Sequence, residues 1–358
     1  MRDEEVVRAR DELLGDNKFA ELLNRFAHEQ KYEARRIISG ATTVEGMHEV
    51  IDRYCEIIVA HTSPGISSSG LEELKDMKKG GFLFVANHRN TIFDGLGTSG
   101  VLLKNGFERA YCASGNNLLD ETYIGHILRS YNCFFFPRPD SNNGLSAKTP
   151  LILSQHIAKQ RQLRNSVWIA QRVGPAIDGN DATDPRVVKM LYLAKPRNGE
   201  VAFSEWMKFM NIVPLSISYE ILTCDREMAQ TVYNLQSNTS YIEPPEVVEK
   251  NVVDGLANEK GHIHYAFGTP IAQDSPDAVA ATAEITNQII GMYRLWPTNW
   301  VAYDHLNDNR TNEGTKYSIK DRASLMARVE AYPEHLRDIV YSMYAKPILN
   351  QQALGHNI

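Results

Sequence analysis

The chain has 358 residues, more than a single hydrophobic core usually organises, so we expect one large domain with a smaller attachment. Its formal net charge of −6 gives no general attraction for nucleic acid or anionic lipid, and we expect no nucleic-acid partner. No run approaches the roughly 18 apolar residues that span a bilayer, and the start Met-Arg-Asp-Glu-Glu does not resemble a signal peptide, so we expect a cytoplasmic protein.

The first 61 residues carry a helical pattern. Apolar side chains in the second half of this segment recur at the three- and four-residue spacing of one helix face: Met47, Val50, Ile51, Tyr54, Ile57 and Ile58. The run Thr62-Ser63-Pro64-Gly65 then breaks the pattern. We therefore predict a helical subdomain over residues 1–65. Residues 66–71 alternate too weakly to predict a strand.

From Phe82 onward, short apolar runs alternate with segments of helix length. The runs that we predict as strands are Phe82 to Ala86, Arg109 to Ala113, Cys133 to Phe136, Val167 to Ala170 and Ile212 to Tyr219. This alternation predicts an α/β fold, with a mostly parallel sheet covered by helices on both faces.

The last third of the chain continues this pattern and then becomes helical. His262 to Phe267 alternates apolar and polar residues and predicts an outer strand, and Ala278 to Leu295 predicts a long helix. After Trp296-Pro297 the pattern is mostly helical. We therefore predict an α/β domain over residues 66–312 and a helical C-terminal extension over residues 313–358 that packs on it.

Polar residues follow the first predicted strand. Asn87 and His88 come directly after it, and Asp94 lies near enough to turn back and accept a hydrogen bond from one nitrogen of His88. In an open α/β sheet, ligands bind at such strand ends. The alternative is structural, with His88 bonded to a carbonyl and Asp94 capping a helix. On this motif alone the two interpretations are evenly matched.

Two later strands each deliver an arginine at the strand end. Arg138 follows Phe134-Phe135-Phe136-Pro137, and Arg172 follows Trp168-Ile169-Ala170-Gln171. Two guanidinium groups beside a His–Asp pair are suited to an anionic substrate, because arginine forms bidentate hydrogen bonds to phosphate. The alternative is that each arginine pairs with a surface carboxylate.

Four blocks of sequence, in this order and spacing, resemble the superfamily of glycerol-3-phosphate and lysophosphatidate acyltransferases (PlsC-like). They are Asn87-His88 with Asp94, Phe134 to Arg138, Trp168 to Gly174, and Ile212 to Glu220, and the resemblance spans roughly residues 66 to 270. The chain is also similar to a bacterial branch with an Asn-His-Arg first block. Leu295-Trp296-Pro297 and Ala302-Tyr303-Asp304 fit that branch.

The resemblance implies a role for individual residues. It makes His88 the general base and Asp94 the group that orients it. The positions that it implies for substrate binding are Arg89, Asn90, Arg138, Arg172, Gly174 and Pro214. Of these, Arg138 and Arg172 would lie near the anionic group of the acceptor, Gly174 would mark a turn, and Arg89 or backbone N–H groups would hold the oxyanion.

Two positions depart from the superfamily pattern. The segment between His88 and Asp94 is one residue longer than usual, and Val173 stands where the third block usually has Glu. The first departure predicts a looped-out residue in the turn. The second removes a carboxylate that normally helps to organise the acceptor site, so the identity of the acceptor stays open.

The resemblance implies transfer of a fatty acyl group from an acyl thioester, either acyl-ACP or acyl-CoA, to a hydroxyl acceptor such as glycerol 3-phosphate or a lysophospholipid. It implies a place in phospholipid biosynthesis, no cofactor besides this co-substrate, and a peripheral contact with the cytoplasmic face of the inner membrane. Three alternatives remain: an amine or other non-glycerol acceptor, an acyl-thioester hydrolase, and a catalytically silent protein that binds lipid or acyl carrier.

We expect no metal site. The four cysteines show no paired metal or redox spacing, and the acidic segment Asp178 to Pro185 lacks the alternating ligands of a calcium loop. Asp184 before Pro185 instead predicts a helix N-cap. Basic residues that could contact a membrane or an acidic carrier occur in Lys75 to Lys79 and at Lys31, Arg35 and Arg36, but ordinary solvated surface is the favoured interpretation of both groups.

Overall fold

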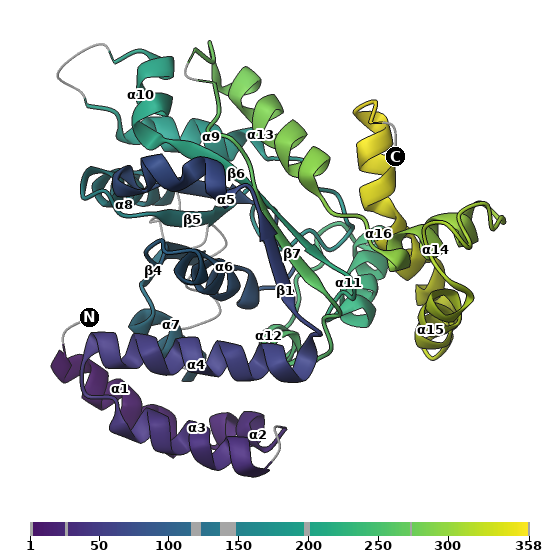
Figure 1. Cartoon of the computed structure of the whole chain (residues 1–358), viewed down its shortest axis with the longest axis horizontal. Helices are drawn as coiled ribbons and strands as arrows, with labels where there is room; N and C mark the ends of the chain where they lie inside the picture. Colours follow the sequence, from purple (N-terminus) through teal and green to yellow (C-terminus); the bar gives the residue numbers. More distant parts are fainter. Residues whose placement is uncertain are drawn as a thin grey trace.

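The computed structural model describes residues 3–25, 28–115, 123–136, 148–196, 201–272 and 274–356. Within them, seven strands form one sheet in the order β1-β7-β6-β2-β5-β3-β4 (Figure 1). The strands are β1 (Ile66–Ser69), β2 (Leu83–Ala86), β3 (Tyr111–Gly115), β4 (Cys133–Phe136), β5 (Val167–Ala170), β6 (Ile212–Tyr219) and β7 (Ile263–Phe267). All neighbouring pairs are parallel except β6 and β7.

Helices precede, cover and follow this sheet. The helices before β4 are α1 (Asp3–Gly15), α2 (Asn17–Asn24), α3 (His28–Gly40), α4 (Val44–Thr62), α5 (Leu71–Leu74), the 3₁₀ helix η1 (Lys75–Gly80), α6 (Phe93–Lys104) and α7 (Tyr123–Ser130). Those between β4 and β7 are α8 (Thr149–Gln162), α9 (Pro185–Leu191), the 3₁₀ helix η3 (Tyr192–Ala194), α10 (Phe203–Met210), α11 (Asp225–Ser237) and α12 (Pro245–Ala257). After β7 come α13 (Ala278–Met292), α14 (Pro297–Leu306), α15 (Ile319–Glu330) and α16 (Glu334–Ala353).

The predicted fold class is confirmed, because the sheet is mostly parallel and both faces carry helices. In β2, Leu83 and Val85 point to one face, where they join a core with side chains of α8, α9, α10 and α13. Phe84 and Ala86 point to the other face and pack with residues of α6. Burial on both faces explains why β2 is a continuous apolar run instead of an alternating one.

One strand position differs from the prediction. His262 to Phe267 is predicted as an outer strand, but β7 lies between β6 and β1, and β1 forms the edge. The three serines of β1, Ser67 to Ser69, leave this strand largely exposed and without an apolar pattern, so the sequence does not reveal it. Polar, short edge strands of this kind resist pairing with other chains.

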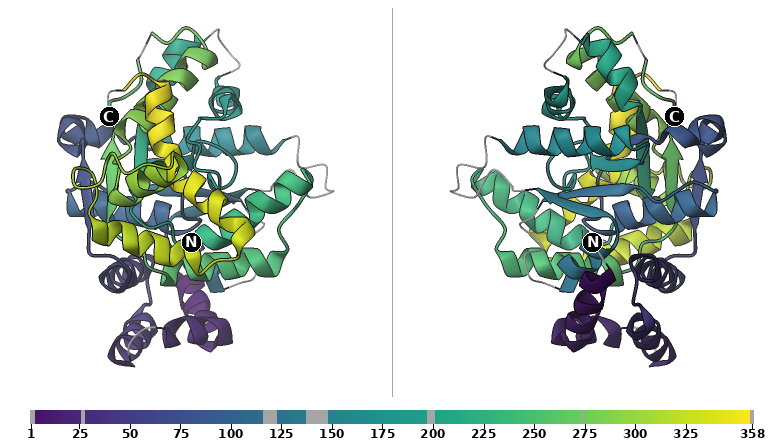
Figure 2. Two further views of the ribbon diagram at one scale, coloured as in Figure 1. Left: turned by 90° about the vertical axis from the view of Figure 1, so that its right-hand side faces the viewer. Right: turned by 90° about the vertical axis from the view of Figure 1, so that its left-hand side faces the viewer.

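The N-terminal helices lie at one end of the molecule, beside α6 and α7 (Figures 1 and 2). The predicted helical character of both ends of the chain is confirmed. At the other end, α16 packs against α11, α13 and α14, and buried Asp225 accepts hydrogen bonds from Arg328, Tyr332 and Tyr344. The domain boundaries at residues 65 and 312 stay predictions. Among the described helices, none is both long enough and apolar enough to cross a bilayer.

Helix α6 contains glycines at the two places where it meets β3 and β7. A methyl group on Gly97 would overlap the phenol oxygen of Tyr265, and one on Gly95 would lie 3.0 Å from Sγ of Cys112. The space at residue 97 is too small for a side chain, and a side chain at residue 95 would require Cys112 to shift by a few tenths of an ångström. The two glycines therefore set the height of α6 above the sheet, and with it the position of the first turn of the helix.

We predict that Gly97→Ala lowers the free energy of unfolding by about 2 kcal/mol, because the added methyl group overpacks the contact with Tyr265. Gly100→Ala is the matched control, since residue 100 is in the same helix and has open space around it. It should raise stability by roughly 0.5–1 kcal/mol through helix propensity. Urea denaturation measures both values, and equal effects of the two substitutions would contradict this account of α6.

Candidate active site

The turn after β2 brings His88 and Asp94 into contact. Nδ1 of His88 donates to Oδ2 of Asp94 at 2.9 Å. Because a carboxylate only accepts hydrogen bonds, Nδ1 carries the proton and Nε2 is left as the basic nitrogen. The hydrogen bond expected from the sequence is therefore present, and the extra residue between the two side chains does not prevent it.

Three further donors hold the carboxylate of Asp94, which is fully buried. The backbone N–H groups of Arg89 and Asn90 donate to Oδ2 at 2.6 and 2.9 Å, and the hydroxyl of Tyr219 donates to Oδ1 at 2.7 Å. Burial, together with the nearby charge of Asp94, raises the pKa of Tyr219 well above its ordinary value, so this phenol stays a neutral donor. The carboxylate is thereby fixed in one orientation toward His88.

The side chain of Asn90 holds the lengthened turn in place. Its Oδ1 accepts from the N–H groups of Ile92 and Phe93 at the start of α6. Its Nδ2 donates to Oγ1 of Thr223 and to the carbonyl of Gly255. Asn90 does not line the cavity described next. In the structure Asn90 thus holds the turn against the start of α6, and the substrate contact expected from the sequence stays a prediction.

A cavity of about 350 Å³ opens beside His88, over the carboxyl ends of β3, β4 and β5. Helices α6, α8 and α9 contribute to its walls, and most of the lining side chains are apolar. Trp168 forms part of the wall and meets the ring of His88 edge to face, with 5.6 Å between ring centroids. A few polar groups in the wall of a mostly apolar cavity are typical of a small-molecule site.

Two arginines line the same cavity. Arg172 donates to the carbonyl of Asn180 at 3.2 Å and lies 3.7 Å from the carboxylate of Asp178. Arg186 extends from the start of α9 and forms an ion pair with Asp184 at 2.6 Å. Both guanidinium groups stay partly or largely exposed, with side-chain exposures of 31% and 85%, so they can reach a bound anion.

Arg186 is not predicted from the sequence as a cavity residue. The structure confirms the predicted N-cap, because Asp184 accepts from the N–H of Arg186, but that prediction contains no reason for the arginine to face a cavity. Gly174 lies in the turn between Arg172 and α9 with φ +74°, which agrees with the turn predicted there and favours glycine. Val173 lines the cavity and is 67% exposed.

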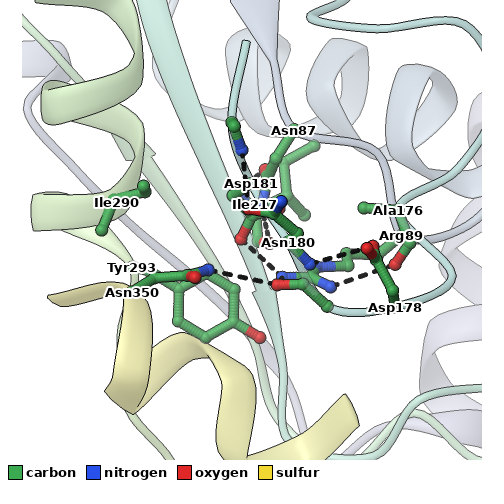
Figure 3. A network of polar contacts seen from close by, with 12 residues as sticks. Asn87, Arg89, Ala176, Asp178, Asn180, Asp181, Ile217, Ile290, Tyr293 and Asn350 are labelled. Atoms are coloured by element: carbon green, nitrogen blue, oxygen red, sulfur yellow. Dashed lines mark hydrogen bonds and ion pairs between the residues drawn. The ribbon is translucent and has the colours of Figure 1, made fainter. Parts of the chain in front are cut away.

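Arg89 occupies a different environment from the one expected for a substrate-binding residue. Its guanidinium is buried, pairs with Asp181 at 2.5 Å and donates to the carbonyls of Ala176 and Gly179 (Figure 3). Burial lowers the pKa of Arg89 and the charge of Asp181 raises it, and the net direction is upward. Arg89 does not line the cavity, so its geometry does not fit the expected contact with an oxyanion.

Two predicted substrate-binding positions remain, Pro214 and Arg138. Pro214 is buried within β6, pairs in register with Val85 and accepts a hydrogen bond from the N–H of Gly268. It therefore belongs to the sheet interior. Arg138 lies outside the described residues. In the described part of the chain, no cluster of three or more His, Cys, Asp or Glu side chains could hold a metal ion.

Comparison with known proteins gives one family match. Residues 65–170, a minority of the chain, match the model of the Acyltransferase family. This segment runs from β1 to β5 and includes His88 and Asp94. No curated protein matches the chain. Among solved structures, the 1-acyl-sn-glycerophosphate (LPA) acyltransferase PlsC from Thermotoga maritima is similar, with 10% identity and a TM-score of 0.39 over 72% of this chain and 79% of that chain.

We predict that Arg89→Met destabilises the fold by about 3–5 kcal/mol, because it leaves the carboxylate of Asp181 buried without its partner. Arg172→Met should change stability by no more than about 0.5 kcal/mol, since Arg172 is half-exposed and its ion pair is long. Urea denaturation of the two variants provides the comparison. Equal stability of both variants would show that the buried pair does not support the turn.

Proposed function

We propose that the protein transfers a fatty acyl group from an acyl thioester to a hydroxyl group of an anionic acceptor, such as glycerol 3-phosphate or a lysophospholipid. The observation that carries this proposal is the His88–Asp94 pair, with His88 in the wall of a mostly apolar cavity. The match of residues 65–170 to the Acyltransferase family supports it. The donor is a thioester of either acyl carrier protein or coenzyme A.

In the proposed reaction, Nε2 of His88 removes the proton of the acceptor hydroxyl as its oxygen attacks the thioester carbonyl. The resulting tetrahedral intermediate collapses, the carbon–sulfur bond breaks, and the thiolate takes the proton from the imidazolium of His88. Asp94 keeps His88 in the required tautomer and stabilises the imidazolium. The products are the acylated acceptor and the free thiol, and no acyl-enzyme is formed.

Different side chains of the cavity wall are suited to the acyl chain and to the acceptor. The apolar side chains beside Trp168 suit a hydrocarbon chain, which gains free energy when it leaves water. Arg172 and Arg186 are suited to the phosphate of an acceptor, because guanidinium groups bind phosphate through directed, charge-assisted hydrogen bonds. Two arginines have no evident purpose if water is the acceptor, so this arrangement favours transfer over hydrolysis.

We predict that His88→Ala lowers kcat by roughly 10²–10⁴-fold, the usual contribution of a general base. The assay combines purified protein with a panel of acyl-CoA and acyl-ACP donors and with glycerol phosphate, lysophosphatidate and amino-lipid acceptors, and mass spectrometry identifies the products. His335→Ala is the control, because this exposed residue of α16 lies away from the cavity. Near-wild-type transfer by a folded His88→Ala variant would refute the mechanism.

We also predict that Arg172→Ala and Arg186→Ala each raise the KM for a phosphate-bearing acceptor by about tenfold or more, since a hydrogen bond to a charged group is worth about 1.5–3 kcal/mol. The KM for an uncharged acceptor should stay the same. Lys159→Ala is the matched control, because Lys159 is an exposed cation of α8 outside the cavity. Thioester cleavage at full rate without any acceptor would instead identify a hydrolase.

A further inference from the structure

Two of the four cysteines lie side by side in the wall of the cavity beside His88. Cys112 belongs to β3 and Cys133 to β4, and the two residues are register partners in this parallel pair of strands. Register partners on neighbouring strands point to the same face of a sheet, and the strands are about 4.8 Å apart. The spacing of the cysteines in the sequence does not indicate this pairing, because it follows from the order of the strands.

The two thiols are near enough to interact. A hydrogen bond between them, together with burial, raises the pKa of Cys133 well above its ordinary value. Disulfides join cysteines whose Cα atoms are about 4.4–6.8 Å apart, a range that includes the spacing of neighbouring strands. A bond between Cys112 and Cys133 therefore needs rotation of the side chains and little movement of the sheet. Cys55 of α4 and Cys224, directly before α11, do not line the cavity.

Cys112 also contacts residues that adjoin His88 and Asp94. Its Sγ lies against Gly95, the residue after Asp94, because a methyl group on Gly95 would be 3.0 Å from this sulfur. Cys112 is the register partner of Trp168, whose ring meets the ring of His88 edge to face. A change in the position of this sulfur therefore acts on both neighbours of the His88–Asp94 pair.

We propose that Cys112 and Cys133 are a modification site, which a peroxide oxidises to a disulfide in the cavity wall, and that this bond lowers the activity of the site. The loss of activity rests on the proposed function, whereas the formation of the disulfide does not. Hydrogen peroxide is the oxidant that we consider, because it is small enough to enter a cavity of about 350 Å³.

The oxidation proceeds in two steps. The thiolate of Cys112 attacks one oxygen of hydrogen peroxide, the O–O bond breaks, and the departing hydroxide takes the proton that Cys112 has lost. Cys112 is then a sulfenic acid. The sulfur of Cys133 attacks the sulfenic sulfur, the S–O bond breaks, and the proton of Cys133 leaves with this hydroxide as a second water. The two sulfurs lose two electrons in total, and the two peroxide oxygens gain them.

The disulfide changes the contacts of Cys112. A covalent S–S bond is much shorter than the contact between two thiols, so Sγ of Cys112 must turn toward β4 and away from Gly95. The first turn of α6 then loses a neighbour, and the cavity wall beside Trp168 shifts. A displacement of about 1 Å can lower the rate of an enzyme roughly a hundredfold. We therefore expect the disulfide to lower kcat/KM about tenfold or more.

The first test counts thiols after treatment with hydrogen peroxide and needs no turnover. Iodoacetamide should label all four cysteines of the reduced, denatured chain and two fewer in the oxidised chain, and peptide mapping should link Cys112 to Cys133. Cys55→Ser is the matched control and should form the same disulfide. In Cys133→Ser the reaction should stop at the sulfenic acid of Cys112, which dimedone labels. No disulfide, or one that includes Cys55 or Cys224, would overturn the inference.

The second test compares the kcat/KM for acyl transfer before and after oxidation. The activity should fall in proportion to the fraction of chains that carry the disulfide, and dithiothreitol should restore it. Cys55→Ser should lose activity to the same extent as the wild type. Full activity of the chain that carries the disulfide would overturn the inferred control of the site while acyl transfer stands. If no donor supports acyl transfer, the proposed function fails, and the thiol count still decides whether Cys112 and Cys133 are oxidised as a pair.

Discussion

The carboxylate of Asp94 is the point on which the site depends. It is buried at the start of α6, and its two oxygens accept hydrogen bonds from the ring of His88, from two backbone N–H groups of the preceding turn and from Tyr219 of β6. A buried carboxylate is costly unless it is fully bonded. The need to satisfy Asp94 therefore holds β2, the turn, α6 and β6 in one arrangement, and that arrangement places His88 in the wall of the cavity.

A buried ion pair supports another part of the cavity wall, the segment that follows β5. The pair of Arg89 and Asp181 connects the turn after β2 to the segment that follows β5, and the same segment carries Arg172 and Gly174. Asn350 of α16 donates to the carbonyl of Gly179 in this segment. The C-terminal helix thus stabilises a loop of the cavity wall from a distance of 171 residues in sequence. A substitution in α16 can act on the site without touching a substrate.

The strands that the sequence predicts correctly are those marked by an apolar run in their own residues. The runs that became β4, β5 and β6 were predicted with their observed bounds, because each is a short, mostly apolar run. The hydrogen bond between His88 and Asp94 was predictable because both lie in one turn. The buried ion pair of Arg89 was not predictable. Its partner Asp181 is 92 residues away, and nothing near Arg89 in the sequence marks it as buried. Arg186 was missed for a similar reason, since its orientation toward the cavity depends on how α9 packs.

The close contact between α6 and β7 limits which amino-acid substitutions this fold tolerates during evolution. Residues 97 and 265 occupy one shared volume, because the phenol of Tyr265 takes the space that a side chain at residue 97 would need. A larger residue at one position is tolerated only with a smaller residue at the other, so their effects on stability are not additive. Among related sequences the two positions should therefore covary, and the pair Gly and Tyr should be inherited together.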